Sequence, residues 1–288
     1  MQTIAVLGLG VMGSGISKSL LRAGFPVIVY NRTPSRADEI AALGAQKADT
    51  VAQAAQQAYV IISMVSDDPV SRTIWLGEAG VLQNAKPGAI LIEMSTLSLD
   101  WIHELAAQAK AHSFDFLHAP VSGSRDAAAN GKLRLYAGGD AAVLERVHPI
   151  LDAISSVRFH VGDVGAAASV KLVMNTLVAA QLASLAEALT LGEQLGIDRS
   201  HMAEIMDGAT STSGLMQFKM NGMVTHAYGE AQFKLSLILK DVRYALKAGH
   251  EVSLPVLEAI QKTYEAAESQ GLGENDASAV AEVKHSKG

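Results

Sequence analysis

Short apolar runs alternate with longer amphipathic stretches through the first half of the chain. The runs have the length of buried β-strands, and they cover residues 4–7, 27–30, 59–64, 89–93, 114–117, 133–137 and 157–160. The helices predicted between them include residues 34–43, which open with Pro34, and residues 99–111, which follow Ser98 as an N-cap. This alternation predicts an α/β fold with a mostly parallel sheet that helices cover on both faces.

The pattern changes near Asp163, after which only helical periodicity remains. The first helix of this half, over residues 166–195, would be about 45 Å long at 1.5 Å per residue. Apolar residues occupy most of its circumference, so we expect it to be buried on nearly all sides, inside a second domain or against another subunit. Helix starts are predicted at Asp198, Thr212 or Ser213, and Pro255, and helix ends at Gly196, Gly208 and Gly249. The sequence therefore predicts two domains, an α/β domain over residues 1–163 and an all-α domain over residues 164–288.

Three glycines follow the first predicted strand in the spacing G-x-G-x-x-G. Such glycines permit a tight turn and a close approach of a ligand to the backbone, and the next helix turns unpaired N–H groups towards an anion. An ordinary strand–turn–helix, whose glycines only serve packing, is the alternative. The second strand follows at βαβ spacing, which favours a Rossmann-type doubly wound sheet that binds a dinucleotide. The predicted cofactor contacts in this turn are Gly8, Leu9, Gly10, Val11, Met12 and Gly13.

The residues after the second strand bear on which dinucleotide binds. Sites that prefer NAD usually carry Asp or Glu about 20 residues after the glycines, where the carboxylate binds the ribose hydroxyls. This chain has Asn31, Arg32 and Thr33 there. A guanidinium beside amide and hydroxyl groups suits a 2′-phosphate, so NADP(H) is favoured over NAD(H). The alternative is that Arg32 is a solvated surface residue.

Composition narrows the class of protein. The chain has 288 residues, of which 49% are hydrophobic, so it is long enough for two cores. A net charge of −6 with scattered Lys and Arg argues against nucleic-acid and anionic-membrane partners and favours a small-molecule substrate. The chain has no cysteine, no histidine pair with metal-ligand spacing and no G-x-S-x-G elbow, so thiol, metal and serine-hydrolase chemistry are disfavoured. We expect neither a secretory signal nor a transmembrane segment, and a cytoplasmic location.

Two groups of polar residues are candidates for chemistry. Lys171 and Asn175 lie four residues apart on one face of the long apolar helix, where a desolvated lysine could exchange a proton with an oxygen that the amide holds. A lysine that reaches solvent is the alternative. The segment 118–124 closes a strand and enters a loop whose backbone N–H groups and serine hydroxyl can hold a carboxylate. The pair 95–96 also ends a strand, and strand ends are where α/β sheets bind ligands. Both segments fit equally well the alternative of a turn whose small residues only allow the backbone conformation and bind no ligand.

Five segments in this order resemble the β-hydroxyacid dehydrogenase family over nearly the whole chain. They are residues 8–13, 31–33, 119–123, 171–175 and 240–241. Within that family the chain looks closest to the glyoxylate and succinic semialdehyde reductases, through residues 31–33, 120–124 and 272–280. The resemblance implies a Rossmann domain, an all-helical second domain, and reversible hydride transfer between a nicotinamide and a small hydroxy acid or its semialdehyde.

The same resemblance implies residue roles, with Lys171 as the catalytic acid/base. The substrate-binding residues that it implies are Ser122, Gly123, Ser124, Asn175, Phe233 and Asp241, and the further cofactor contacts are Met64, Val65, Ser95, Thr96 and Lys240. Many relatives carry an acidic residue in place of His118 and glycine in place of Ser124, so we expect the rim of the substrate pocket to differ. Imine reductases usually lack the lysine and non-catalytic nuclear scaffolds lose it, so its presence argues against both.

These inferences predict an NADPH-dependent reductase of glyoxylate or succinic semialdehyde, with Lys171 as the proton donor. One alternative is a dehydrogenase that oxidises 3-hydroxyisobutyrate or another 3-hydroxy acid. A cofactor-binding scaffold without turnover is the alternative of another class. We expect a homo-oligomer, either a dimer or a tetramer.

Overall fold

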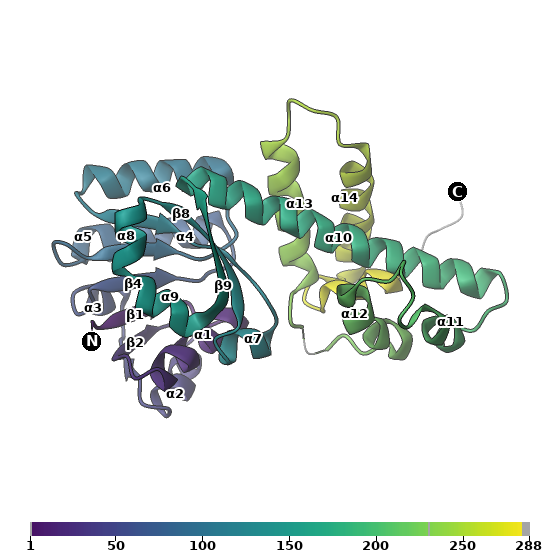
Figure 1. Cartoon of the computed structure of the whole chain (residues 1–288), viewed down its shortest axis with the longest axis horizontal. Coiled ribbons are helices and arrows are strands. Elements are labelled where there is room, and N and C mark those ends of the chain that lie inside the picture. Colours follow the sequence, from purple (N-terminus) through teal and green to yellow (C-terminus); the bar gives the residue numbers. More distant parts are fainter. Residues whose placement is uncertain (1, 230, 284–288) are drawn as a thin grey trace. The chain divides into compact units, whose positions relative to one another are not determined.

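The computed structural model describes residues 2–229 and 231–283, and the chain divides by its contacts into two compact units, 1–171 and 172–288 (Figure 1). The N-terminal unit is built on one sheet with the strand order β3-β2-β1-β4-β5-β6-β8-β7, and β9 pairs with β8. Its strands are β1 (Ile4–Leu7), β2 (Val27–Tyr30), β3 (Gln46–Lys47), β4 (Val60–Ser63), β5 (Ile90–Glu93), β6 (Asp115–His118), β7 (Val121–Ser122), β8 (Leu133–Gly139) and β9 (Ser155–Gly162). Pairing is parallel from β3 to β6, which gives the doubly wound arrangement that the sequence predicts.

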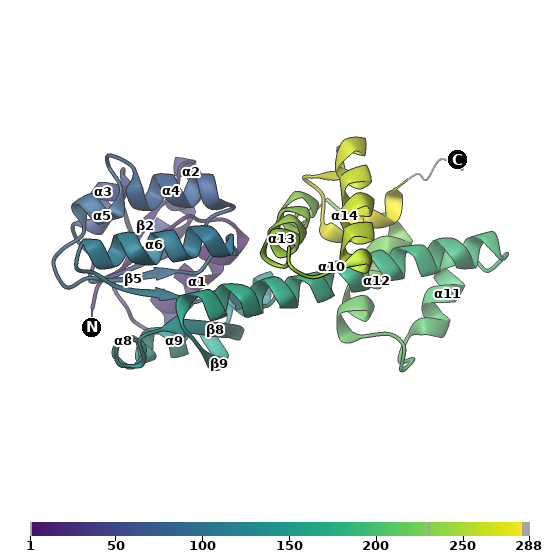
Figure 2. The same cartoon turned by 90° about the horizontal axis from the view of Figure 1, so that it is seen from above.

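Helices cover both faces of this sheet, and Figure 2 shows α4, α5 and α6 on one side and α8 and α9 on the other. One layer contains α1 (Val11–Arg22), α2 (Pro34–Ala41), α7 (Arg125–Ala129), α8 (Ala141–Arg146) and α9 (His148–Ile154), and the other contains α3 (Val51–Ala55), α4 (Asp68–Leu76), α5 (Val81–Asn84) and α6 (Leu99–Ala111). Alternate residues of β1 enter the two cores, Ile4 and Val6 on one face and Ala5 and Leu7 on the other. Strands buried on both faces explain the continuous apolar runs in the sequence.

All seven predicted strands are confirmed, with boundaries that shift by a few residues. The strands that the pattern missed, β3 and β7, have two residues each and include no apolar run. Ser98 caps α6 as predicted, because its Oγ accepts a hydrogen bond from the Trp101 N–H at 3.2 Å.

The regular elements of the second unit are all helices in its described residues, apart from one isolated β-bridge between Lys234 and Asp276. Its elements are α10 (Val164–Gln194), which begins in the N-terminal unit, α11 (Arg199–Met206), α12 (Gly214–Thr225), α13 (Leu235–Ala248), α14 (Pro255–Ala267), a π-helical turn (Glu268–Leu272) and a 3₁₀ helix, η2 (Ala277–Glu282). Asp198 and Ser213 cap α11 and α12 with their side chains, and Pro255 opens α14. The domain boundary that the sequence places at Asp163 stays a prediction.

Helix α10 differs in part from its prediction. It is long and apolar enough to cross a membrane by length and composition alone, a test that core helices of soluble proteins also pass. Leu182, Leu185 and Leu189 belong to the core of the helical unit. Burial on nearly all sides is not observed within the single chain, since Leu177 and Leu191 are 52% and 59% exposed. That another subunit covers this face stays a prediction.

Candidate active site

The glycine turn lies where the strand order reverses between β1 and β4, the point at which doubly wound sheets bind ligands. Gly8 has a φ of +98°, and a Cβ there would lie 2.3 Å from the Met64 carbonyl oxygen. At Gly13 a Cβ would lie 1.9 Å from the Gly8 carbonyl oxygen. The protein's own packing therefore requires these two glycines.

Gly10 is different, because its backbone is extended with a φ of −69° and a Cβ there would meet nothing within 4 Å. Packing within the chain does not require glycine at this position. The open space in front of it, at the N-terminus of α1, fits the close approach of a dinucleotide pyrophosphate. The alternative in which all three glycines only serve packing thus fails at Gly10.

This contrast gives a prediction that separates folding from cofactor binding. Gly13→Ala should lower the free energy of unfolding by about 1–3 kcal/mol, because a backbone carbonyl stands in the way of the new Cβ. Gly10→Ala should change that free energy by no more than about 0.5 kcal/mol. It should still weaken binding of the reduced dinucleotide roughly tenfold. Urea unfolding without cofactor and a fluorescence titration measure the two effects, and equal destabilisation by both variants would contradict the assignment.

The two residues after β2 differ in role. The side chain of Asn31 bonds within the protein, whereas that of Arg32 is open to a ligand. Asn31 Oδ1 accepts a hydrogen bond from the Leu9 N–H at 2.9 Å, and its Nδ2 donates to the Thr33 carbonyl at 3.0 Å. Asn31 therefore fixes the shape of the glycine turn. Arg32 is exposed, and within the described residues its guanidinium has no hydrogen bond or ion pair. The guanidinium is available to a ligand beside the turn.

A buried carboxylate that the sequence analysis missed organises the ends of β4 and β5. Glu93 Oε1 accepts hydrogen bonds from the Ser95 N–H at 2.9 Å and from Ser95 Oγ at 2.5 Å. Its Oε2 accepts from Ser71 Oγ at 2.8 Å and from Trp75 Nε1 at 2.7 Å. Burial raises the pKa of Glu93, although these donors oppose the shift. The available signal was an acidic residue in an otherwise apolar strand.

Ser95 also holds the segment that follows β4, because its Oγ accepts a hydrogen bond from the Val65 N–H at 2.7 Å. The predicted cofactor residues after β4 and β5, Met64 to Val65 and Ser95 to Thr96, are thereby held side by side. The network fixes their backbone and leaves Thr96, which is only partly buried, beyond the end of the strand.

Lys171 and Ser122 come together in the N-terminal unit. Lys171 Nζ donates to Ser122 Oγ at 3.3 Å, and the lysine is only 8% exposed. The alternative of a lysine that reaches solvent does not hold. A buried ammonium at the end of a strand is a candidate proton donor for a substrate oxygen bound beside it.

The loop that carries Ser122 is fixed to the helix of the glycine turn. Ser124 Oγ caps α7 by accepting from the Ala127 N–H at 3.1 Å. Helix α7 in turn packs closely on α1, where a Cβ at Gly15 would lie 2.6 Å from the Ala128 Cβ and Ser19 Oγ donates to the Ala128 carbonyl at 3.1 Å. The substrate role of Ser124 stays a prediction, and its observed role is the cap.

In the helical unit, Asn175 and Asp241 are paired. Asn175 is 4% exposed, and its Nδ2 donates to Asp241 Oδ2 at 2.5 Å. Asp241 Oδ1 lies 2.8 Å from Lys240 Nζ, which also lies over the Tyr244 ring. Phe233 is partly buried just before α13, where its N–H donates to Asp276 at 3.4 Å. Asn175 follows Lys171 by one turn of α10, so the two adjoin along the same helix.

His118, one of the two positions at which the substrate pocket is expected to differ from relatives, is buried in this structure, and the difference at the rim stays a prediction. Its side chain is fully buried, with Nε2 3.1 Å from the Ser95 carbonyl oxygen and Nδ1 3.3 Å from the Val164 carbonyl oxygen. Because the ring ends a core strand, it faces backbone and not solvent.

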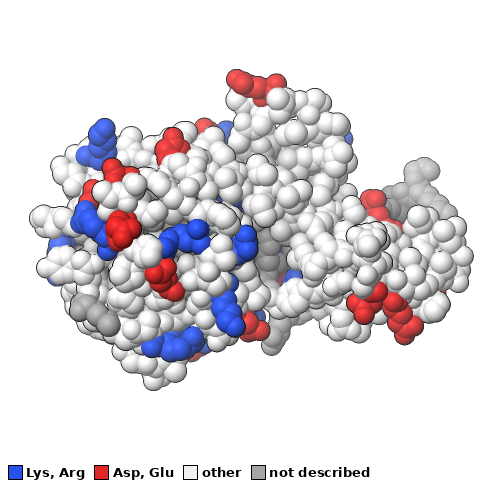
Figure 3. Space-filling view, viewed as in Figure 1, with Lys and Arg blue, Asp and Glu red and all other residues white. Residues whose placement is uncertain are grey.

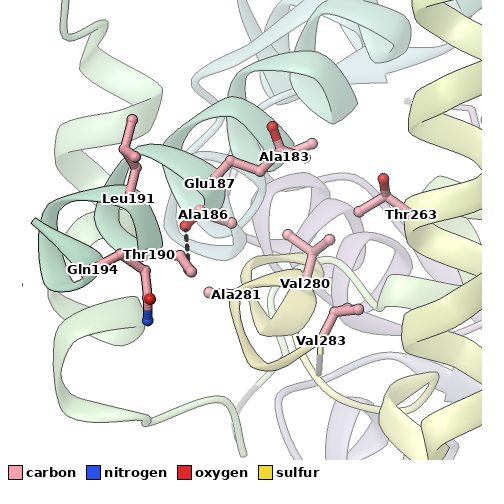
Figure 4. Close-up of a pocket in the computed structure, with 10 residues that line it drawn as sticks. All are labelled: Ala183, Ala186, Glu187, Thr190, Leu191, Gln194, Thr263, Val280, Ala281 and Val283. Atoms are coloured by element: carbon pink, nitrogen blue, oxygen red, sulfur yellow. Dashed lines mark hydrogen bonds between the residues drawn. The ribbon is translucent and has the colours of Figure 1, made fainter. Parts of the chain in front are cut away.

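A cavity of about 340 Å³ in the helical unit (Figure 4) contains none of the predicted site residues. It is lined by Ala183, Ala186, Glu187, Thr190, Leu191, Gln194, Thr263, Val280, Ala281 and Val283. Basic and acidic side chains are interspersed over the face of the N-terminal unit in Figure 3. No cluster of three or more metal-ligating side chains occurs among the described residues.

Comparison with known proteins covers both halves of the chain. Residues 3–162 match the family described as the NAD binding domain of 6-phosphogluconate dehydrogenase, and residues 165–284 match that described as NAD-binding of NADP-dependent 3-hydroxyisobutyrate dehydrogenase. Glyoxylate/succinic semialdehyde reductase 1 of Arabidopsis thaliana is 33% identical over 99% of both chains. The 2-(hydroxymethyl)glutarate dehydrogenase of Eubacterium barkeri is 33% identical over 97% of this chain and 94% of its own length. The crystal structure of 3-hydroxyisobutyrate dehydrogenase from Salmonella typhimurium superposes with a TM-score of 0.92 at 27% identity, covering 99% of this chain and 100% of that one.

Proposed function

The chain belongs to the β-hydroxyacid dehydrogenase family of nicotinamide-dependent oxidoreductases, and from that premise we propose that it is an NADPH-dependent reductase of small carboxylate-bearing aldehydes. The observation that carries the proposal is the buried Lys171 ammonium, 3.3 Å from Ser122 Oγ. Glyoxylate and succinic semialdehyde are the proposed substrates, by similarity to the Arabidopsis reductase.

The proposed reaction adds one hydride and one proton to the aldehyde and gives a primary alcohol. When bound, the reduced nicotinamide would supply the hydride to the carbonyl carbon. As negative charge develops on the oxygen, the Lys171 ammonium donates the proton and becomes a neutral amine. Burial strengthens the interaction between the ammonium and the developing charge, because little water screens it. The oxidation of a 3-hydroxy acid runs through the same residues in reverse, and the likeness to 3-hydroxyisobutyrate dehydrogenase supports it as the second candidate.

The substrate carboxylate is proposed to bind at Ser122 and Gly123. Gly123 has a φ of +151°, and a Cβ there would lie 2.8 Å from Leu133 Cδ2, so only glycine fits this turn easily. The hydroxyl of Ser122 and the backbone N–H groups of the turn are the donors that a carboxylate needs.

Comparison of succinic semialdehyde with butanal tests this assignment. We expect kcat/KM to be roughly 10- to 100-fold higher for succinic semialdehyde, because butanal leaves donors of a buried site unpaired, at a cost of about 1–3 kcal/mol. Ser122→Ala should reduce this preference by acting mainly on the acid-bearing aldehyde. Equal kcat/KM values for the two aldehydes in the unmodified protein would show that no carboxylate site operates.

A further inference from the structure

His118 is the one imidazole in the described residues that joins the end of β5 to the start of α10. It ends β6, pairs in register with Glu93 of β5 and is fully buried. Its Nε2 contacts the Ser95 carbonyl at 3.1 Å and its Nδ1 contacts the Val164 carbonyl at 3.3 Å. Ser95 adjoins Thr96 on the proposed cofactor side, and Val164 is the first residue of α10.

The Ser95 end of this bridge is rigid. Its N–H and Oγ both donate to Glu93, and its Oγ accepts from the Val65 N–H. These three hydrogen bonds do not involve His118, so they keep the Ser95 segment in place when the imidazole is removed. The ring therefore links the start of α10 to the fixed Ser95 segment, next to the proposed cofactor site.

The other end of the bridge lies two helical turns from the catalytic lysine. Lys171 comes seven positions after Val164, which is about 10 Å along a helix at 1.5 Å per residue. The same end of α10 is closely packed, since a Cβ at Gly165 would lie 2.3 Å from His103 Nε2 and one at Gly138 would lie 2.1 Å from the Asp163 carbonyl oxygen. A small shift of Val164 in this packing is transmitted along the helix to Lys171 Nζ.

Both partners of His118 are carbonyl oxygens, so the one N–H of a neutral ring bonds to one carbonyl while the ring packs against the other. Burial lowers the pKa of His118 to about 4, and the ring is therefore neutral at pH 7 and donates to one carbonyl at a time. An apolar side chain of similar size would fill the space and donate to neither carbonyl.

We propose that His118 is a positioning residue, which holds the start of α10 against the Ser95 segment and so places Lys171 Nζ for proton donation. This inference rests on the proposed role of Lys171 in the reduction. It assigns to His118 no contact with the substrate or the cofactor.

A double-mutant cycle on the full chain tests the proposal, with His118→Leu, Lys171→Ala and the pair of substitutions assayed with NADPH and succinic semialdehyde. His118→Leu should lower kcat about tenfold, because displacement of a reacting group by a fraction of an ångström is enough for such a loss. KM and the NADPH dissociation constant should change less than about threefold, because the Ser95 segment keeps its other bonds. In the Lys171→Ala background the same substitution should change kcat less than about twofold.

Phe116→Leu is the matched control, because it truncates a side chain on the same strand that packs edge-on against Trp75 and makes neither of the His118 hydrogen bonds. It should leave kcat within about twofold of the unmodified protein. Should His118→Leu fail to fold, His118→Asn takes its place in the cycle. Its amide is too short to reach both carbonyls, and the expected loss in kcat is about threefold.

An unchanged kcat in a folded His118 variant overturns the proposal, and so does an equal fractional loss with and without Lys171. Near-normal kcat in Lys171→Ala overturns the proposed function itself, and with it the coupling. The two failures are therefore distinguished by the single Lys171 variant.

Discussion

Lys171→Ala is expected to lower kcat by about 10²- to 10⁴-fold, which is the usual contribution of a positioned general acid. Its Nζ is buried and bonded to Ser122 Oγ at 3.3 Å, so water cannot readily replace it as a proton source. Melting temperature should be retained because alanine favours the helix, and NADPH affinity because Lys171 is not among the residues proposed to bind the cofactor. Steady-state kinetics and a fluorescence titration measure the two quantities.

Lys171→Arg is the matched control, because it separates proton donation from charge. The guanidinium keeps the positive charge but holds its proton above pH 12, so it should restore little of the lost turnover. Recovery of most of the activity by arginine would show that electrostatic stabilisation is enough. Near-normal turnover of a folded Lys171→Ala protein would remove the lysine from the mechanism.

The strands of the N-terminal unit could be predicted because parallel strands buried on both faces leave uninterrupted apolar runs. The helix start at Ser98 was equally visible, since a hydroxyl that accepts from the third N–H is a local requirement. By contrast, β3 consists of Gln46 and Lys47, and pairing with β2 alone makes it a strand. Such short elements depend on a neighbour that no local pattern reveals.

The candidate site also has features that a local sequence pattern predicts and features that depend on distant contacts. Glycine spacing locates the turn, but only the three-dimensional contacts show that packing requires Gly8 and Gly13 and leaves Gly10 open. Asn31 was expected beside a phosphate, and its observed bonds shape the turn. Glu93 and His118 are isolated polar residues at strand ends. Their hydrogen-bond partners come from segments up to 46 residues away in the sequence. No spacing rule identifies such partners from one sequence.

Arg32→Ala is expected to weaken NADPH binding by about 1.5 to 3 kcal/mol, or roughly 10- to 150-fold, with little change for NADH. The guanidinium is exposed beside the glycine turn, and Asn31 stands where a ribose-binding carboxylate would favour NAD. The two cofactors differ only in the 2′-phosphate, so an effect on one alone locates the contact.

Lys110→Ala, at the exposed end of α6, is the control for the loss of one positive charge. It should change neither dissociation constant by more than about twofold, because solvent and salt screen a distant surface charge. Fluorescence titration of both variants with both cofactors, at two salt concentrations, separates a direct phosphate contact from general attraction. Equal losses for NADPH and NADH in Arg32→Ala would contradict the contact, since an arginine that binds only the 2′-phosphate cannot affect a cofactor that lacks it.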